Sequence, residues 1–154
     1  LREIYPKGSE SRDTLKTWHF MLGLSVFVLV WVRLITRWVT LTPNAPSTLT
    51  KWHGLLAQAF HFALYILMIC MPIAGWLILS AEGKSIPFLG FTLPTLIAED
   101  EHLAKTIEEV HKTAGTVGYY IIGLHVLAGL YHHYIRHDNA LFRMLPIINS
   151  KSEE

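Results

Sequence analysis

The sequence is poor in charged residues and in cysteine. Of its 154 residues, 16% are charged and 51% are hydrophobic, whereas a soluble domain carries about a quarter charged residues. The single cysteine, Cys70, lies in an apolar stretch and excludes a disulfide framework or a thiolate cluster within the chain. We expect it to be a small buried hydrophobe. The net charge of +1 lacks the basic excess that nucleic-acid binding requires, so no nucleic-acid partner is expected.

Aspartate and glutamate are absent from three long apolar stretches, at about 17–39, 52–80 and 112–136. A bilayer core of about 30 Å is crossed by roughly 20 apolar residues in a helix. The sequence therefore predicts an all-α membrane protein, a transmembrane helical bundle with these three spans in one domain over residues 1–154. Pro72 lies inside the second span, where neighbouring helices can satisfy the carbonyl that it frees, and it predicts a kink.

The two connections differ in character. Residues 40–51 form a short loop rich in Pro, Ser and Thr, whereas residues 81–110 are longer and acidic. The middle of the longer connection, SIPFLGFTLPTLI, is apolar and broken by proline, and we expect it to lie on the membrane surface. From about Asp100 a helix should begin that leads into the third span.

Lysine and arginine orient the chain in the membrane. Basic residues flank the 40–51 loop and occur in the C-terminal tail, so the positive-inside rule assigns both to the cytoplasmic side. The N-terminal tail then lies outside although it is basic as well, and the chain begins with Leu1. We expect from this combination that an upstream helix precedes the sequence. The residues are Arg33, Arg37, Lys51, Arg136, Arg143 and Lys151 inside, and Arg2, Lys7, Arg12 and Lys16 outside.

The nine histidines are the residues of this sequence that most directly suggest a chemical function. An ionisable residue inside a membrane is costly, so each one there is a candidate for function. His102 and His137 fall in polar segments, where we expect solvated side chains. His53 begins the second span and is expected at the interface.

Depth in the membrane pairs several of the remaining histidines. His19 and His111 each stand near the outer start of a span and could face each other. His125 follows His111 by 14 residues, which is about 21 Å along a helix and only about 40° off the same face. Two imidazoles on one stripe suit two stacked haems held by axial histidines. Glycines on the third span fit either a flat macrocycle or close helix contact: Gly115, Gly118, Gly123 and Gly129.

The inner half of the membrane leaves alternatives open. His61 matches the depth of His125 and could ligate an inner haem, bind a haem propionate or hydrogen-bond a quinone carbonyl. His132 and His133 lie closer to the cytoplasm and fit an interfacial or propionate role better than an iron ligand. Arg33 and Arg37 suit a propionate or a lipid phosphate.

Three segments carry a resemblance to a known family: TWHFMLGLSVFVLVWVRL, LLAQAFHFALYILMICMPIAGW and EEVHKTAGTVGYYIIGLHVLAGLYHHYIRHDNALFRMLP. The last is the most specific, with GLH followed by HHY, DN and LFRMLP. Together they make nearly the whole chain similar to the bacterial cytochrome b561 family, the quinone-linked dihaem membrane cytochromes that include superoxide oxidase. The haem b subunit of nickel–iron hydrogenases is a broader relative.

The resemblance implies a role for each matching histidine. His19 and His111 match the axial pair of the outer haem, and His125 matches one ligand of the inner haem, whose other ligand lies on the family's first helix. The three spans match the family's second to fourth helices, so the first one is missing. Either the chain is truncated, or the inner haem uses His61, or that haem is lost. His61 itself matches the quinone end. A multi-pass protein of the bacterial inner membrane is implied.

Three functions compete. The first is electron transfer between ubiquinone and a donor through haem b, with superoxide as one donor, for which Lys84, Lys105 and Lys112 are the candidate basic entry. The second is a haem-binding membrane anchor that links a partner oxidoreductase to quinone, as in hydrogenases. The third, a divalent-metal transporter, is disfavoured because such sites usually add carboxylates, which the spans lack.

Overall fold

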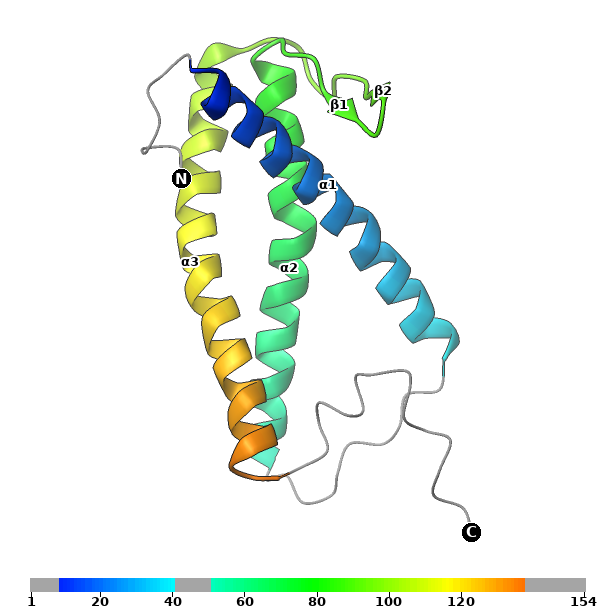
Figure 1. Ribbon diagram of the computed structural model, residues 1–154, viewed down its shortest axis with the longest axis vertical. Helices are drawn as coiled ribbons and strands as arrows, with labels where there is room; N and C mark the ends of the chain where they lie inside the picture. Colours follow the sequence, from blue (N-terminus) through cyan, green and yellow to red (C-terminus); the bar gives the residue numbers. More distant parts are fainter. Residues whose placement is uncertain (1–8, 41–50, 138–154) are drawn as a thin grey trace.

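The described part of the chain folds into three long helices and one small hairpin. The computed structural model describes residues 9–40 and 51–137. Helix α1 spans Glu10–Val39 and α2 spans Lys51–Ala81; strands β1 (Pro87–Phe88) and β2 (Phe91–Thr92) follow, and α3 spans Glu101–Tyr134. The starts of α1 and α3 and the end of α2 meet at one end of the molecule (Figure 1), which we call the outer end. The opposite end is called the inner end.

Two of the helices begin well before the predicted spans. Helix α1 starts seven residues before the expected position 17, because its polar first turns are helical too, with Lys16 Nζ 3.4 Å from Asp13 Oδ1. Helix α3 starts at Glu101, which confirms the prediction that a helix begins near Asp100 and leads into the third span. The side chain of Asp100 accepts a hydrogen bond of 2.9 Å from the Leu103 amide, as an N-cap residue does. Helix α2 continues through Pro72 without ending.

Helices α2 and α3 lie side by side along their lengths, while α1 crosses α2 and then diverges from it (Figure 1). Glycines permit the close contact between α2 and α3. A Cβ at Gly118 would meet Leu67 at 3.5 Å, and one at Gly115 would meet Met71 at 3.5 Å. These two glycines therefore serve helix packing, whereas Gly123 has nothing within 4 Å of such a Cβ, and neither has Gly129.

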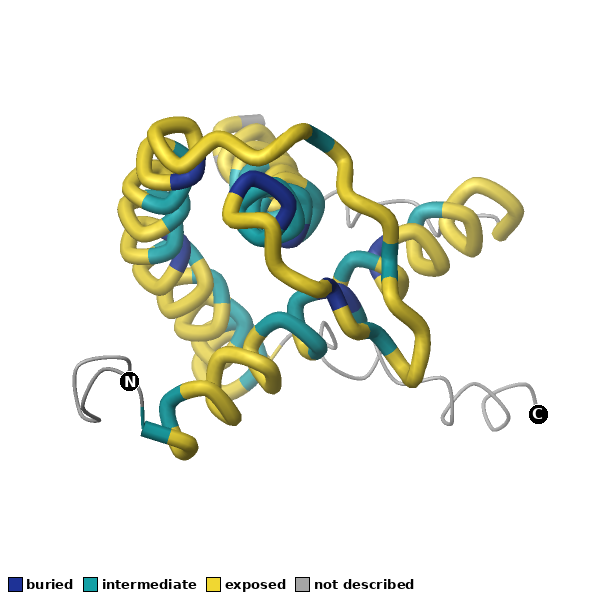
Figure 2. Tube along the Cα trace, turned by 90° about the horizontal axis from the view of Figure 1, so that it is seen from above, coloured by how far each residue is buried: buried dark blue, intermediate teal, exposed yellow. Residues whose placement is uncertain are grey.

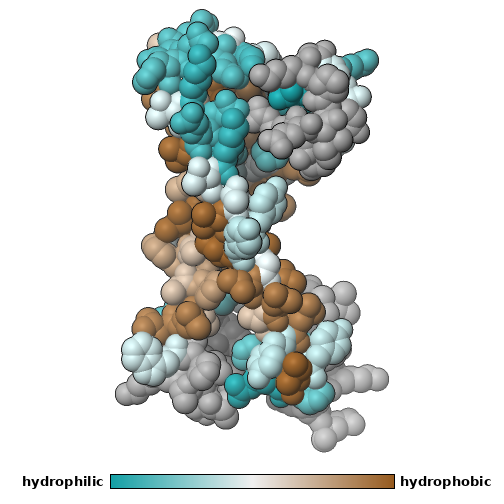
Figure 3. All heavy atoms as spheres, turned by 90° about the vertical axis from the view of Figure 1, so that its left-hand side faces the viewer, coloured by the Kyte–Doolittle hydropathy of each residue, from teal (hydrophilic) through white to brown (hydrophobic). Residues whose placement is uncertain are grey.

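The helices cannot be stabilised by a protein core alone. In the most apolar 18-residue stretch of each helix, at most 11% of the residues are buried by the rest of the chain. The exposed large side chains are mainly apolar, and apolar atoms gather over the middle of the molecule while hydrophilic ones cover its outer end (Figure 3). Each helix is long enough to cross a bilayer, so lipid covers this surface. The expectation of a buried Cys70 is wrong, because its side chain is exposed on this lipid-covered surface.

Three of the buried residues lie at the outer end of α2 and in the segment that follows it (Figure 2). Ala81 is 2% exposed, Ile86 is 1% exposed and Ser80 is fully buried. Ser80 Oγ donates to the Trp76 carbonyl and accepts from the Leu96 amide, at 2.9 and 3.1 Å. The connection that follows α2 is therefore fixed to the bundle and is no loose loop.

Candidate functional site

Two histidines from α1 and α3 face each other near the outer end. The ring centres of His19 and His111 are 6.2 Å apart, with an angle of 81° between the ring planes. His19 is exposed and His111 is half-buried. We call these two residues the outer pair. Two imidazoles on opposite sides of one metal ion, each bonded at about 2 Å, have ring centres about 6 Å apart once the half-width of each ring is added.

The helices that carry the outer pair do not pack directly on each other within the described residues: α1 contacts α2, and α2 contacts α3. The two rings thus face each other across a separation that α2 maintains. At the back of this site, a Cβ added to Gly75 of α2 would lie 3.8 Å from His111 Cε1. Gly23, one turn after His19, has nothing within 4 Å of an added Cβ. Small residues therefore leave room next to both imidazoles, as a flat, wide group requires.

A second pair of histidines lies closer to the inner end. The ring centres of His61 and His125 are 5.3 Å apart, with an angle of 75° between the rings. His61, on α2, is exposed, and His125, on α3, is half-buried. We call these residues the inner pair. His125 follows His111 by 14 residues on one helix, so the two pairs are about 21 Å apart along α3.

The inner pair has a polar neighbour that the sequence did not reveal. Tyr65 stands one turn after His61, and its hydroxyl accepts a hydrogen bond of 3.3 Å from Arg33 Nε on α1. The spacing of four residues between His61 and Tyr65 places both on one helix face, and this spacing was the available signal.

The other histidines take no part in these pairs. His102 and His137 are exposed, which confirms the expectation of solvated side chains. The rings of His132 and Tyr131 are 6.0 Å apart, and those of His133 and Tyr134 are 4.7 Å apart, at the inner end of α3. His53 lies in α2, but its side chain is outside the described part of the structure.

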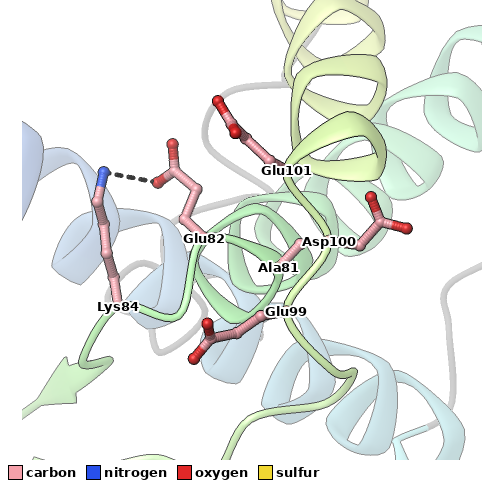
Figure 4. Close-up of a pocket in the computed structure, with 6 residues that line it drawn as sticks. All are labelled: Ala81, Glu82, Lys84, Glu99, Asp100 and Glu101. Carbon is pink, nitrogen blue, oxygen red and sulfur yellow. Dashed lines mark ion pairs between the residues drawn. The ribbon is translucent and has the colours of Figure 1, made fainter.

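The three lysines considered as a basic entry site each form an ion pair with a carboxylate. The ammonium of Lys84 is 2.8 Å from Glu82, that of Lys105 is 2.8 Å from Glu101, and that of Lys112 is 3.2 Å from Glu108. Figure 4 shows Lys84 directed at Glu82 beside an open pocket of about 430 Å³. The pocket is lined by Ala81, Glu82, Lys84, Glu99, Asp100 and Glu101. The outer end is therefore acidic around its lysines.

The donor set of the outer pair fits the axial coordination of haem iron. Histidine is a common axial ligand of haem, and the dry, helix-lined surroundings set the potential of the iron. In residues 9–40 and 51–137, no three His, Cys, Asp or Glu side chains converge as metal ligands. The arrangement is suited to two redox centres, one near each end of α3.

Comparison with known proteins also indicates a haem-binding membrane protein. Residues 3–146 match the family described as prokaryotic cytochrome b561. The chain is 34% identical over 146 residues to cytochrome b561 homolog 1 of Escherichia coli (strain K12), covering 95% of this chain and 83% of that protein. It is also 34% identical to a protein named probable superoxide oxidase CybB of Yersinia pestis, with 95% and 82% covered. Cytochrome b561 homolog 2 of Escherichia coli (strain K12) is 29% identical over 128 residues, with 82% and 68% covered.

The family match includes every residue that the structure describes. It agrees with the three apolar helices and with imidazoles that face each other between them. The chain therefore belongs to the prokaryotic cytochrome b561 family, as a multi-pass protein of the bacterial inner membrane that binds b-type haem and transports electrons.

Proposed function

We propose that this cytochrome passes electrons between a donor at its outer end and ubiquinone at its inner end, through haem at two levels of the bundle. The observation that carries this proposal is the presence of two imidazole pairs at two depths, joined by one helix. When bound, haem b supplies a one-electron carrier at each level. The protein provides the ligands, the orientation and the surroundings that set the potentials.

The outer pair would hold the outer haem. His19 and His111 approach from different helices at a ring separation close to that of two ligands on one metal. Gly75 keeps the space behind the His111 ring free of a side chain. Helix α2, which contacts both α1 and α3, sets the distance between the two ligands.

At the inner end, His125 would ligate the second haem, and His61 would serve the quinone. The inner rings are 5.3 Å apart, closer than the 6.2 Å of the outer pair, which favours His61 as a neighbour of the ligand over His61 as the second ligand. His61 and Tyr65 stand on one face of α2 and can donate hydrogen bonds to quinone carbonyls. Arg33, which donates to Tyr65, adds a fixed positive charge beside the quinone as it takes up two electrons and two protons.

The outer electron donor has two candidates. The name of the Yersinia pestis relative points to superoxide. Superoxide is an anion, and an entry site for it should be locally basic. The pairing of Lys84, Lys105 and Lys112 with carboxylates favours the second candidate, a partner oxidoreductase that uses the protein as a haem-binding link to quinone.

Spectroscopy and rapid mixing test the proposal. The purified chain should show a Soret band and, after reduction, an α band; a colourless protein would refute the haem assignment. Reduced protein should be oxidised by added ubiquinone. A pulse of superoxide should reduce the oxidised protein only if superoxide is the donor, whereas unchanged absorbance after the pulse leaves the partner oxidoreductase as the candidate.

A single substitution tests the outer pair. His111→Ala should lose one haem while the bundle still inserts in the membrane, because the polar start of α3 and its apolar length are unchanged. His102→Ala is the matched control, since His102 is an exposed residue of the same helix. Full haem content in His111→Ala would contradict the proposed pairing.

A further inference from the structure

The connection between α2 and α3 is divided into a charged base and an uncharged tip. Residues 85–98 contain no charged side chain, while Glu82, Lys84, Glu99 and Asp100 flank them on both sides. At the base, Lys84 and Glu82 form an ion pair of 2.8 Å, in which the Lys84 side chain is 57% exposed and that of Glu82 is 30% exposed. The uncharged part folds into the β1–β2 hairpin, in which Phe88 pairs with Phe91.

The tip of the hairpin exposes apolar side chains at a cost in backbone conformation. Leu89 and Gly90 form its two-residue turn with φ values of +49° and +87°. Turns of this kind favour Asn, Asp or Gly, and a bulky residue with positive φ is uncommon and strained. Leu89 is nevertheless present and is 67% exposed, next to Phe91 at 76%. Strained residues persist where the surroundings hold them and often mark a function.

The bundle holds this tip in a fixed place. Trp76 Nε1 donates a hydrogen bond of 2.9 Å to the Pro94 carbonyl, and the Asp100 amide donates one of 3.0 Å to the Ala81 carbonyl. Strand β1 also contacts α1. In Figure 1 the hairpin lies off the side of the bundle and below the level at which α2 ends, beside the upper part of α1. The charged base thus stays at the end of the bundle, while the tip lies lower, beside the outer part of α1.

We infer that the hairpin tip, Leu89 and Phe91, inserts into the interfacial region of the outer lipid leaflet and anchors the outer end of the bundle. Lipid is the occupant that fits an uncharged apolar tip beside membrane-crossing helices, below a base whose ion pair belongs in water. This inference goes beyond electron transfer and does not depend on the haem assignment.

Spin labels on the full-length chain in lipid nanodiscs test the depth of the tip. Cys70→Ala removes the native cysteine, and single cysteines are then introduced as Phe91→Cys at the tip, Lys84→Cys at the base and Phe62→Cys on the exposed face of α2. The label at 91 should collide with oxygen as the label at 62 does. Its collisions with a water-soluble nickel chelate should be several-fold fewer than at 84. Equal nickel access at 91 and 84 overturns the inference, and so does exclusion of both reagents at 91, which indicates a protein partner.

A polar substitution at the turn gives an independent test. Leu89→Asn suits the positive φ better than leucine, so the hairpin should keep its fold. It should raise nickel access at position 91 by several-fold, because a polar tip leaves the lipid. Ser85→Asn places the same side chain at the exposed base and should change nothing. Unchanged access at 91 in Leu89→Asn overturns the inference.

Discussion

The space beside His111 gives the sharpest test of the proposed outer haem site. A Cβ at position 75 would lie 3.8 Å from His111 Cε1, which is ordinary van der Waals contact. Gly75→Ala should therefore keep the outer haem, and alanine is also the better helix former by about 1 kcal/mol. Gly75→Val adds two methyl groups about 1.5 Å beyond Cβ. Because the χ1 angle of valine is restricted in a helix, it has little freedom to turn both away from the ring.

The expected size of the effect follows from the same distance. A methyl directed at the ring would come within roughly 2.3 Å of it, against a preferred contact of about 3.5–4.0 Å, so the imidazole must move by more than 1 Å. Overpacking of this kind costs about 1–3 kcal/mol. If the strain falls on the ligand, the affinity of the outer haem decreases by roughly 5-fold to 150-fold.

Haem transfer measures this loss. Excess apomyoglobin takes up haem released from the purified cytochrome, and the rate of the change in the Soret band reports the dissociation of each haem. Gly75→Val should accelerate one phase only, and Gly75→Ala should match the native chain. If both variants behave alike, or if both haems of Gly75→Val are lost together, the placement of Gly75 behind the His111 ligand is refuted.

Three further outcomes are expected. His125→Ala should lose the inner haem, whereas His61→Ala should keep it and slow ubiquinone reduction; loss of a haem in His61→Ala, read from the α band, would make His61 an iron ligand instead. Ser80→Ala should lower the free energy of unfolding by about 0.5–1.5 kcal/mol, because the Leu96 amide and the Trp76 carbonyl lose their hydrogen bonds to the buried Ser80 hydroxyl; an unchanged thermal midpoint would contradict this. Tyr65→Phe removes the acceptor of the hydrogen bond that Arg33 of α1 donates to α2. In a double-mutant cycle that combines it with a substitution of Arg33, the coupling energy should be about 0.6 kcal/mol, and a coupling energy of zero would show that this contact does not stabilise the packing of α1 on α2.

The apolar pattern of the sequence predicted the helices well, because a membrane admits few alternatives to helices. The start of α1 at Glu10 was not predicted, since hydropathy marks only the part of a helix that lies in lipid and not the polar turns before it. The β1–β2 hairpin was predicted as a membrane-surface segment without its strands. Its turn depends on positive φ at Leu89, and leucine gives no sequence signal for that conformation.

The expected depth of His19 and His111 in the membrane predicted that they could face each other, and in the structure their ring centres are 6.2 Å apart, face to edge. Their role as haem ligands stays a prediction. The neighbours of the histidines were harder to predict, because Gly75 and Arg33 come from other helices and helical periodicity gives no rotation of one helix relative to another. The ion pairs of the outer lysines were not predicted either. Two of them, Glu101–Lys105 and Glu108–Lys112, have the four-residue spacing of helical ion pairs, which was the available signal.

The backbones of α1 and α3 do not pack on each other within the described residues, so the stability of the protein should depend on the supply of haem. If both His19 and His111 hold the haem, the cofactor would join two helices whose backbones do not come close to each other within the described residues. A ligand at a free concentration of 100 times its Kd stabilises the folded state by about 2.7 kcal/mol, which is a large share of an ordinary folding margin. A cell short of haem should therefore keep less of this cytochrome, because membrane proteases remove the loosened apoprotein.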